Sequence, residues 1–432
     1  MEEDITAALY HAVDNNDLIK LRHLLQDGAN PNERYTGTPY VSFTILHLSC
    51  EKGNLHTTRA LVEAGADVLS RDTWGMSPLI HSIICQQEDV VEYLISECPS
   101  SLNFPDKSGK SPLHFAIESD NVAILNLLIR CNADINKETV QGVTPLISVC
   151  QIPKLTKRET IAKILIKQGA VVDSKDALDY RTALQISLTK RHLDVVPLLL
   201  RAGADVNTED KGGHTPLTNL ISSSVRPSCD VIGDDVIEVM TLLIQMGANL
   251  NSNKCENSNP LLVSTLLKSA KFVEYFLACG ADPNIEFSSG ITPLIAATGN
   301  RDQNTVRLLL EHNAKVDPPA LVSYGRRERR LYDPFELAVD LLQWDIVDLL
   351  VQYGYNLSQH DYMLSMTPSD RTPVALLNNP DTHDRLRRIA CSPPSLEKIV
   401  ILNVRKILGL NLLQKVQKLV LPYDVRNKLV NL

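Results

Sequence analysis

The chain has 432 residues, a net charge of −8, 44% hydrophobic and only 5% aromatic residues. This composition predicts a soluble helical protein with room for several compact domains or one elongated array, and its acidic balance argues against nucleic acid as the main partner. The nine cysteines include no CxxC pair, which indicates reduced thiols in the cytoplasm or the nucleus. Met1-Glu2-Glu3-Asp4 is acidic where a signal peptide is basic, and no apolar run reaches membrane-span length, so we expect no membrane insertion.

A Thr/Ser-Pro-Leu motif, or a close variant of it, recurs along most of the chain at a base period of 33 residues. The Thr or Ser can cap the first helix of a repeat, and the Pro suits the first turn of that helix. A second helix follows in each repeat and ends at a residue such as Gly203, where a left-handed backbone conformation is needed. The pattern predicts ten helix–turn–helix repeats, of which the first begins near Ile5 without the motif, and a degenerate eleventh at Thr372. The motifs begin at Thr44, Ser77, Ser111, Thr144, Thr182, Thr215, Asn259, Thr292 and Asp333.

Motif and period together resemble the ankyrin-repeat family. The resemblance implies an all-α solenoid of paired helices and hairpin loops over residues 1–390, with a concave side that binds an unknown protein substrate. The longer steps between motifs predict four insertions, which we expect to be surface loops that contribute to partner specificity. They are Arg34–Ser42, Gln151–Glu159, Ser222–Asp235 and Pro318–Leu331.

Three aromatic residues lie in the hairpin segments and are candidate target-binding anchors: Trp74, Tyr180 and Phe287. Tyr180 stands where other repeats have the hairpin glycine. The alternative is that each ring packs locally against a neighbouring hairpin. The acidic charge of the array favours a basic partner surface.

We expect no catalytic residue, cofactor or metal site. His47 and His114 follow the Leu of the motif, where the ring is expected to make hydrogen bonds between repeats. The sequence has no zinc-ligand spacing, phosphate loop or nucleophile motif. Asn136 and Asn207 lie in contexts that resemble ankyrin sites hydroxylated by an asparaginyl hydroxylase, and the alternative is that they stabilise a turn.

The last forty residues differ from the array in charge and pattern. Residues 385–432 contain ten Lys or Arg and two Asp or Glu. Ser395 is a good helix cap after two prolines, Gly409 is a natural helix stop, and Pro422 ends a second apolar run. Such a short, aliphatic segment cannot bury its apolar surface alone, so part of it must pack on the array or on a partner.

This segment, residues 391–432, resembles a SOCS box, a three-helix module that joins substrate receptors to Elongin B/C and a cullin–RING ligase. The resemblance implies Elongin contacts by Leu396, Ile399, Val400 and Val404, and cullin contacts by Leu419, Leu421 and Pro422. Val400 stands where the family has Cys, and Val420 where it has Pro.

With its repeats, the chain resembles the ankyrin-repeat and SOCS-box family. This implies a substrate-recognition subunit that brings a target protein to ubiquitination and degradation. One alternative is a non-catalytic scaffold or inhibitor whose C-terminal helices only cap the array. Another is a basic amphipathic helix that lies on an anionic membrane.

Overall fold

The computed structural model describes residues 2–38, 41–225, 232–287, 290–316, 320–322, 330–355 and 380–391. The chain divides into two units, Met1–Lys211 and Gly212–Leu432. The predicted SOCS-box-like residues from Leu396 to Pro422 lie outside the described residues, as does Thr372.

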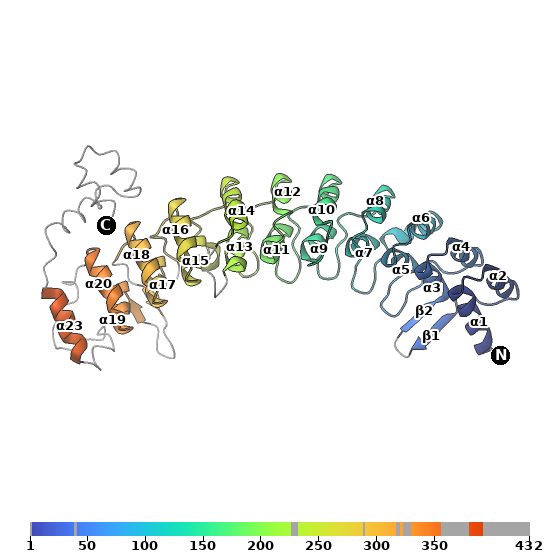
Figure 1. Ribbon diagram of the computed structural model, residues 1–432, viewed down its shortest axis with the longest axis horizontal. Coiled ribbons are helices and arrows are strands. Elements are labelled where there is room, and N and C mark those ends of the chain that lie inside the picture. The colour runs from blue at the N-terminus through green and yellow to red at the C-terminus, as the bar shows by residue number, and fades with distance from the viewer. Residues whose placement is uncertain are drawn as a thin grey trace. The chain divides into compact units, whose positions relative to one another are not determined.

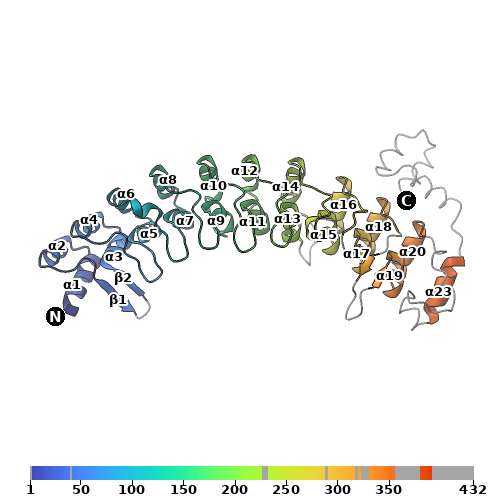
Figure 2. The same ribbon diagram turned by 180° about the vertical axis from the view of Figure 1, so that it is seen from behind.

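Each unit is built from consecutive pairs of antiparallel helices. In the first unit, the first helices of the pairs line up beside one another and the second helices form another row (Figure 1; Figure 2 shows the reverse side). The six pairs of this unit are α1 (Glu2–Asp14) and α2 (Leu18–Gln26), α3 (Ile45–Lys52) and α4 (Leu55–Glu63), α5 (Pro78–Ile84) and α6 (Glu88–Glu97), α7 (Pro112–Glu118) and α8 (Val122–Arg130), α9 (Pro145–Gln151) and α10 (Arg158–Lys167), and α11 (Ala183–Lys190) and α12 (Val196–Arg201).

The described residues of the second unit form four such pairs and a further helix, α23 (Pro380–Cys391). The described part of the chain thus contains ten helix pairs, as many as the repeats predicted from the motif. Two short 3-10 helices, η1 (Pro99–Asn103) and η2 (Glu256–Ser258), lie in connections. The four pairs are α13 (Pro216–Ser224) and α14 (Asp234–Gln245), α15 (Pro260–Leu266) and α16 (Ala270–Ala278), α17 (Pro293–Gly299) and α18 (Gln303–Glu311), and α19 (Pro334–Asp340) and α20 (Trp344–Gln352).

The repeated motif starts each first helix and anchors it in the core. The Thr144 side chain accepts a hydrogen bond from the Ile147 N–H, and Pro145 occupies the first turn. The motif leucines are at most 1% exposed, and burial of each contributes roughly 1.5–3 kcal/mol. One motif therefore both begins a helix and fixes its buried face. These leucines are Leu46, Leu79, Leu113, Leu146, Leu184, Leu217, Leu261 and Leu294.

Two of the four insertions contain strands, so the expectation of plain loops is wrong there. Strands β1 (Arg34–Thr38) and β2 (Val41–Thr44) pair antiparallel, with Tyr35 opposite Phe43. The Tyr35 ring stacks on that of Tyr10 at a centroid distance of 4.2 Å, which ties the hairpin to α1. Strands β3 (Ala320–Val322) and β4 (Arg330–Tyr332) also pair antiparallel. Aromatic and β-branched residues at alternating positions were the missed strand signal.

Helix α23 packs against the last helix pair. The Arg385 guanidinium lies over the Trp344 ring of α20, 4.7 Å from its centroid, and 4.0 Å from the Asp348 carboxylate. The Leu386 and Thr382 side chains are buried. Because α20 is the final helix of the tenth repeat, these contacts place α23 beside the end of the array.

Gly109 shows how closely neighbouring hairpins approach. Its φ is +83°, and a Cβ atom there would lie 2.7 Å from the Val140 nitrogen of the next hairpin. We expect Gly109→Ala to lower the free energy of unfolding by about 2 kcal/mol, since left-handed strain and a backbone clash add together. Gly65→Ala is the control, because Gly65 has φ +91° but no atom within 4 Å of the added Cβ. Urea unfolding should show a larger loss for Gly109→Ala; equal losses would contradict the close approach.

Candidate partner-binding site

The hairpins between the pairs of the first unit form a continuous ridge. We call four of them fingers: residues 71–77, 105–111, 138–144 and 175–182. The N–H groups of Lys107, Val140 and Ala177 donate to the carbonyls of Trp74, Ser108 and Gln141 on the preceding finger, at 3.2, 2.9 and 2.8 Å. One backbone hydrogen bond thus joins each finger to the next, which holds the finger tips in fixed register.

A polar side chain at the base of each finger holds its turn in shape. Asp72 Oδ1 accepts from the Trp74 and Met76 N–H groups at 2.9 and 2.8 Å. Asp106 makes the same two bonds in the next finger, to the N–H groups of Ser108 and Lys110. These bonds satisfy backbone donors that would otherwise have to be hydrated, so the tips are preorganised for a partner.

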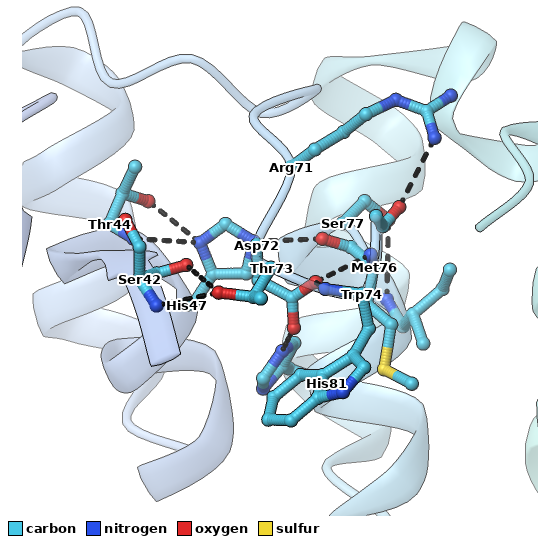
Figure 3. Close-up of polar contacts among 12 residues, drawn as sticks. Ser42, Thr44, His47, Arg71, Asp72, Thr73, Trp74, Met76, Ser77 and His81 are labelled. Atoms are coloured by element: carbon cyan, nitrogen blue, oxygen red, sulfur yellow. Dashed lines mark hydrogen bonds and ion pairs between the residues drawn. The ribbon is translucent and has the colours of Figure 1, made fainter. Parts of the chain in front are cut away.

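The first finger is further held by the helix behind it. The second oxygen of Asp72 lies 3.0 Å from His81 Nε2 on α5 (Figure 3). Burial raises the pKa of the Asp72 carboxyl, but the hydrogen bonds from His81 and from the Met76 N–H outweigh it and leave the pKa below its ordinary value. A charged Asp72 therefore links the finger that carries Trp74 to α5.

The β1–β2 hairpin continues the ridge before the first finger. The Arg34 guanidinium donates to the Arg71 carbonyl at 2.6 Å. The Ser42 N–H donates to Thr73 Oγ1 at 2.7 Å (Figure 3). The insertion Arg34–Ser42 thus supports the finger that presents Trp74.

His47 and His114 have the structural role predicted for them. His47 Nδ1 accepts from the Thr44 N–H at 3.2 Å, and its Nε2 bonds the Met76 carbonyl of the next repeat at 3.0 Å. His114 makes the equivalent bonds to Ser111 and to the Val143 carbonyl. Burial and the neighbouring His81 lower the pKa of His47 to about 4. A neutral ring that both accepts and donates is a structural bridge between repeats.

Two of the three predicted anchors are exposed and one is not. Trp74 and Tyr180 are each 52% exposed, at finger tips of the first unit. Phe287, in the second unit, is 5% exposed and packs with Leu262 and Ile285, so the prediction of an exposed anchor at Phe287 is wrong. The cause is its position: Trp74 directly precedes its hairpin glycine, whereas Phe287 is three residues before Gly290, at the finger base occupied elsewhere by Asp72.

Two apolar finger residues were missed in the sequence. Val140 is 77% exposed and Leu178 is 57% exposed. The sequence signal for both is an apolar side chain within two positions of the hairpin glycine, or of its substitute Tyr180. The finger tips therefore present a row of apolar side chains that includes Trp74, Val140, Leu178 and Tyr180.

Tyr180 occupies a backbone conformation that favours glycine, with φ +55°. We expect Tyr180→Gly to raise the free energy of unfolding by about 1 kcal/mol, because it removes left-handed strain. Asn132→Gly at φ +68° is the control and should gain less, since Asn tolerates this conformation. If thermal unfolding shows no increase in stability for Tyr180→Gly, the left-handed backbone at Tyr180 does not destabilise the protein.

A groove of about 560 Å³ lies between the second and third fingers, against the ends of α7 and α9. Its charged lining consists of Lys107, Lys110 and Glu118, and polar lining comes from Thr139, Gln141, Ser148 and Gln151. The groove is open, and its lining combines these hydrogen-bonding groups with the apolar Val140, Val143 and Ile152, so it suits a peptide segment.

The described residues contain no group of three His, Cys, Asp or Glu side chains arranged to hold a metal ion. Within the same residues, no helix is long and apolar enough to cross a membrane. Asn136 bridges two repeats: its Nδ2 donates to the Gly169 carbonyl at 3.3 Å and its Oδ1 accepts from the Val171 N–H at 2.8 Å. These two hydrogen bonds give Asn136 a structural role between repeats.

A family model described as ankyrin repeats (three copies) matches residues 9–106, 46–139, 96–176, 125–210, 228–320 and 264–361. The chain belongs to the ankyrin-repeat family, as its helix pairs and fingers indicate. The matches cover the repeats and end before α23.

Individual relatives share the repeats at low identity. The probable 26S proteasome regulatory subunit p28 of Saccharomyces cerevisiae is 28% identical over 183 residues, which is 41% of this chain and 78% of p28. Alpha-latrocrustotoxin-Lt1a of Latrodectus tredecimguttatus is 33% identical over 129 residues, 30% of this chain and 9% of the toxin. The mouse B-cell lymphoma 3 protein homolog is 23% identical over 229 residues, 51% of this chain and 48% of that protein. The chain thus spans less than half of the toxin and of the lymphoma protein.

Proposed function

We propose that this ankyrin-repeat protein is the substrate-recognition subunit of an Elongin B/C–cullin–RING ubiquitin ligase. The repeats bind protein partners, and the proposal is that the fingers of the first unit hold the target while the C-terminal segment recruits the ligase. The observation that carries the target-binding half is the hydrogen-bonded ridge with exposed apolar tips. Large exposed side chains on a rigid support are the usual energetic centres of protein interfaces.

The ligase half rests on the sequence of the C-terminal segment. Leu396, Val400 and Val404 follow one another at intervals of four, as the Elongin-binding stripe of a SOCS box does, and Ile399 adds to the same stripe. Leu419, Leu421 and Pro422 stand where that family contacts a cullin. Helix α23 is compatible with this reading, since it lies beside α20 of the last repeat through Arg385.

In this role the chain acts by proximity and performs no bond chemistry itself. A target held on the fingers would have its lysines close to the ubiquitin thioester carried by the RING partner, which raises their effective concentration. With its thiols reduced, the protein would work in the cytoplasm or the nucleus.

Co-purification tests the proposal. We expect the full chain to retain Elongin B/C and a cullin, and Leu396→Asp to lose both, because a carboxylate in the apolar stripe cannot be desolvated at the Elongin surface. Leu178→Asp on a finger is the control and should retain both. A wild-type chain that retains neither protein would refute the ligase role.

A non-catalytic scaffold or inhibitor is the second candidate. It is favoured by similarity that is confined to the repeats, for example 26% identity over 209 residues to human NF-kappa-B inhibitor zeta, which is 46% of this chain and 27% of that protein. This candidate predicts partner binding without retention of Elongin B/C.

A further inference from the structure

The insertion Gln151–Glu159 is fastened to the preceding repeat by one aspartate. Asp120, in the turn between α7 and α8, accepts hydrogen bonds from the N–H groups of Thr156 and Lys157, both at 3.1 Å, and from the Thr156 hydroxyl. The Lys157 ammonium donates to the Asp120 carbonyl at 3.2 Å. We call these four hydrogen bonds the Asp120 clasp. Three of them end on the carboxylate, so a second negative charge placed beside it would oppose the clasp.

The clasp lies close in the chain to the groove between the second and third fingers. Gln151 and Ile152 line that groove, and they are the residues at which α9 ends and the insertion begins. The Ile152 N–H donates to the carbonyl of Ser148, another lining residue, at 3.1 Å. Three residues separate Ile152 from Thr156, so release of Thr156 from Asp120 loosens the segment that forms this wall of the groove.

Thr156 is exposed and lies in a basic segment. Residues 151–159 contain three cations, Lys154, Lys157 and Arg158, and one acid, Glu159, which leaves a net charge of +2. An acidic substrate cleft attracts such a segment once it has separated from Asp120. Phosphoryl transfer then uses the hydroxyl alone: its oxygen bonds to the γ-phosphorus of ATP, the bond from that phosphorus to ADP breaks, and the hydroxyl proton passes to a carboxylate of the kinase.

A phosphate on Thr156 and the clasp exclude each other. The hydroxyl donor is lost, and a group with a charge of about −1.5 to −2 is placed against the Asp120 carboxylate. In the unmodified chain the clasp and the buried Leu155, which is 7% exposed, keep the segment closed. A kinase therefore reaches the hydroxyl during local openings, and the phosphate then keeps the open form populated.

We propose that Thr156 is a phosphorylation site for a Ser/Thr kinase that selects basic segments, and that the phosphate opens the Asp120 clasp. The phosphorylated form differs from the unmodified one at the groove wall formed by Gln151 and Ile152. The ladder of the fingers is unchanged, because its hydrogen bonds involve neither Thr156 nor Asp120. This modification site goes beyond the proposed ligase role and does not depend on it.

Hydrogen exchange tests whether the phosphate opens the clasp. The full chain is prepared with phosphoserine at position 156 by codon reassignment, and Thr156→Ser, which keeps the hydroxyl, is the control. Relative to the matching unfolded peptides, we expect the amides of residues 152, 156 and 157 to exchange about tenfold faster with the phosphate than in the control. The Val140 amide, in the ladder of the fingers, should exchange at the same rate in both. Equal exchange at residues 156 and 157, or faster exchange at Val140 as well, would overturn the proposal.

Phosphorylation of the intact protein tests whether the hydroxyl is used. The full chain is incubated with Mg²⁺, ATP and the catalytic domain of protein kinase C, which selects basic substrates, and the phosphate is located by mass spectrometry. We expect phosphate at Thr156, about fivefold faster in Asp120→Asn, because the amide offers one acceptor oxygen in place of two and the clasp opens more often. Ser108 is the internal control: it is exposed between Lys107 and Lys110, but the ladder holds its finger, so it should stay unmodified. Absence of phosphate at Thr156 in both proteins, or faster modification of Ser108, would overturn the proposal.

Discussion

Lowering the pH from 7 to 4 should reduce the free energy of unfolding of the first unit by about 3 kcal/mol through His47 alone. The pKa of His47 is lowered from 6.5 to about 4 by burial and by His81. The unfolded chain therefore binds a proton below pH 6.5, whereas the native chain binds it only near pH 4. The neutral His47 ring makes its full contribution to the free energy of unfolding above pH 6.5. This contribution is lost as the pH falls toward 4, at about 1.4 kcal/mol per pH unit.

The chain itself supplies the control for this titration. Gln185 occupies the equivalent position in another repeat, where its Oε1 accepts from the Thr182 N–H and its Nε2 donates to the Thr208 carbonyl, both at 3.1 Å. His47→Gln should therefore keep both bonds and remove the titrating group. His114 also has a lowered pKa because of burial and remains in both proteins, so their difference isolates His47. Urea unfolding followed by Trp74 fluorescence, in a Trp344→Phe background, makes the measurement; parallel pH profiles would contradict the assignment.

Arg158→Met should lower the free energy of unfolding by about 3 kcal/mol, because it removes several charge-assisted hydrogen bonds at once. Arg158 is 5% exposed, and its guanidinium donates to the carbonyls of Val149, Ile152 and Pro153 at 2.6, 2.8 and 3.3 Å. These carbonyls lie at the end of α9 and in the Gln151–Glu159 insertion. Loss of Arg158 leaves the buried Val149 carbonyl without this donor, whereas water can reach the carbonyls of the half-buried Ile152 and the exposed Pro153.

Arg130→Met is the matched control, since Arg130 is exposed at the end of α8. Urea unfolding should show little change for this control, and limited proteolysis should cleave the insertion faster in Arg158→Met than in the wild type. Similar stability of the two variants would show that the guanidinium does not hold this loop.

The array could be predicted from the sequence because each repeat contains several separate signals for the same helix. Thr144 is a cap, Pro145 a first-turn residue and Leu146 a core residue, and the same three signals return at a nearly constant period. The histidine bridge of His114 followed from the same register. Local signals that agree with one another and with the period leave few alternative folds.

The binding surface could be predicted less well, because exposure within a finger depends on the position of a residue by one or two places. Trp74 next to its glycine points outward, and Phe287 three places before its glycine is buried. The strands of two insertions are shorter than six residues, so their aromatic and β-branched residues give only a weak strand signal.

Isothermal titration of Elongin B/C, with thermal unfolding on the same samples, tests the central claim most directly when the full chain is compared with residues 1–391. We predict that the full chain binds Elongin B/C, that residues 1–391 do not, and that the two unfold at the same temperature because residues 1–391 keep the ten helix pairs and α23. A full chain that fails to bind, or a shortened chain that binds equally well or unfolds at a markedly lower temperature, would contradict it.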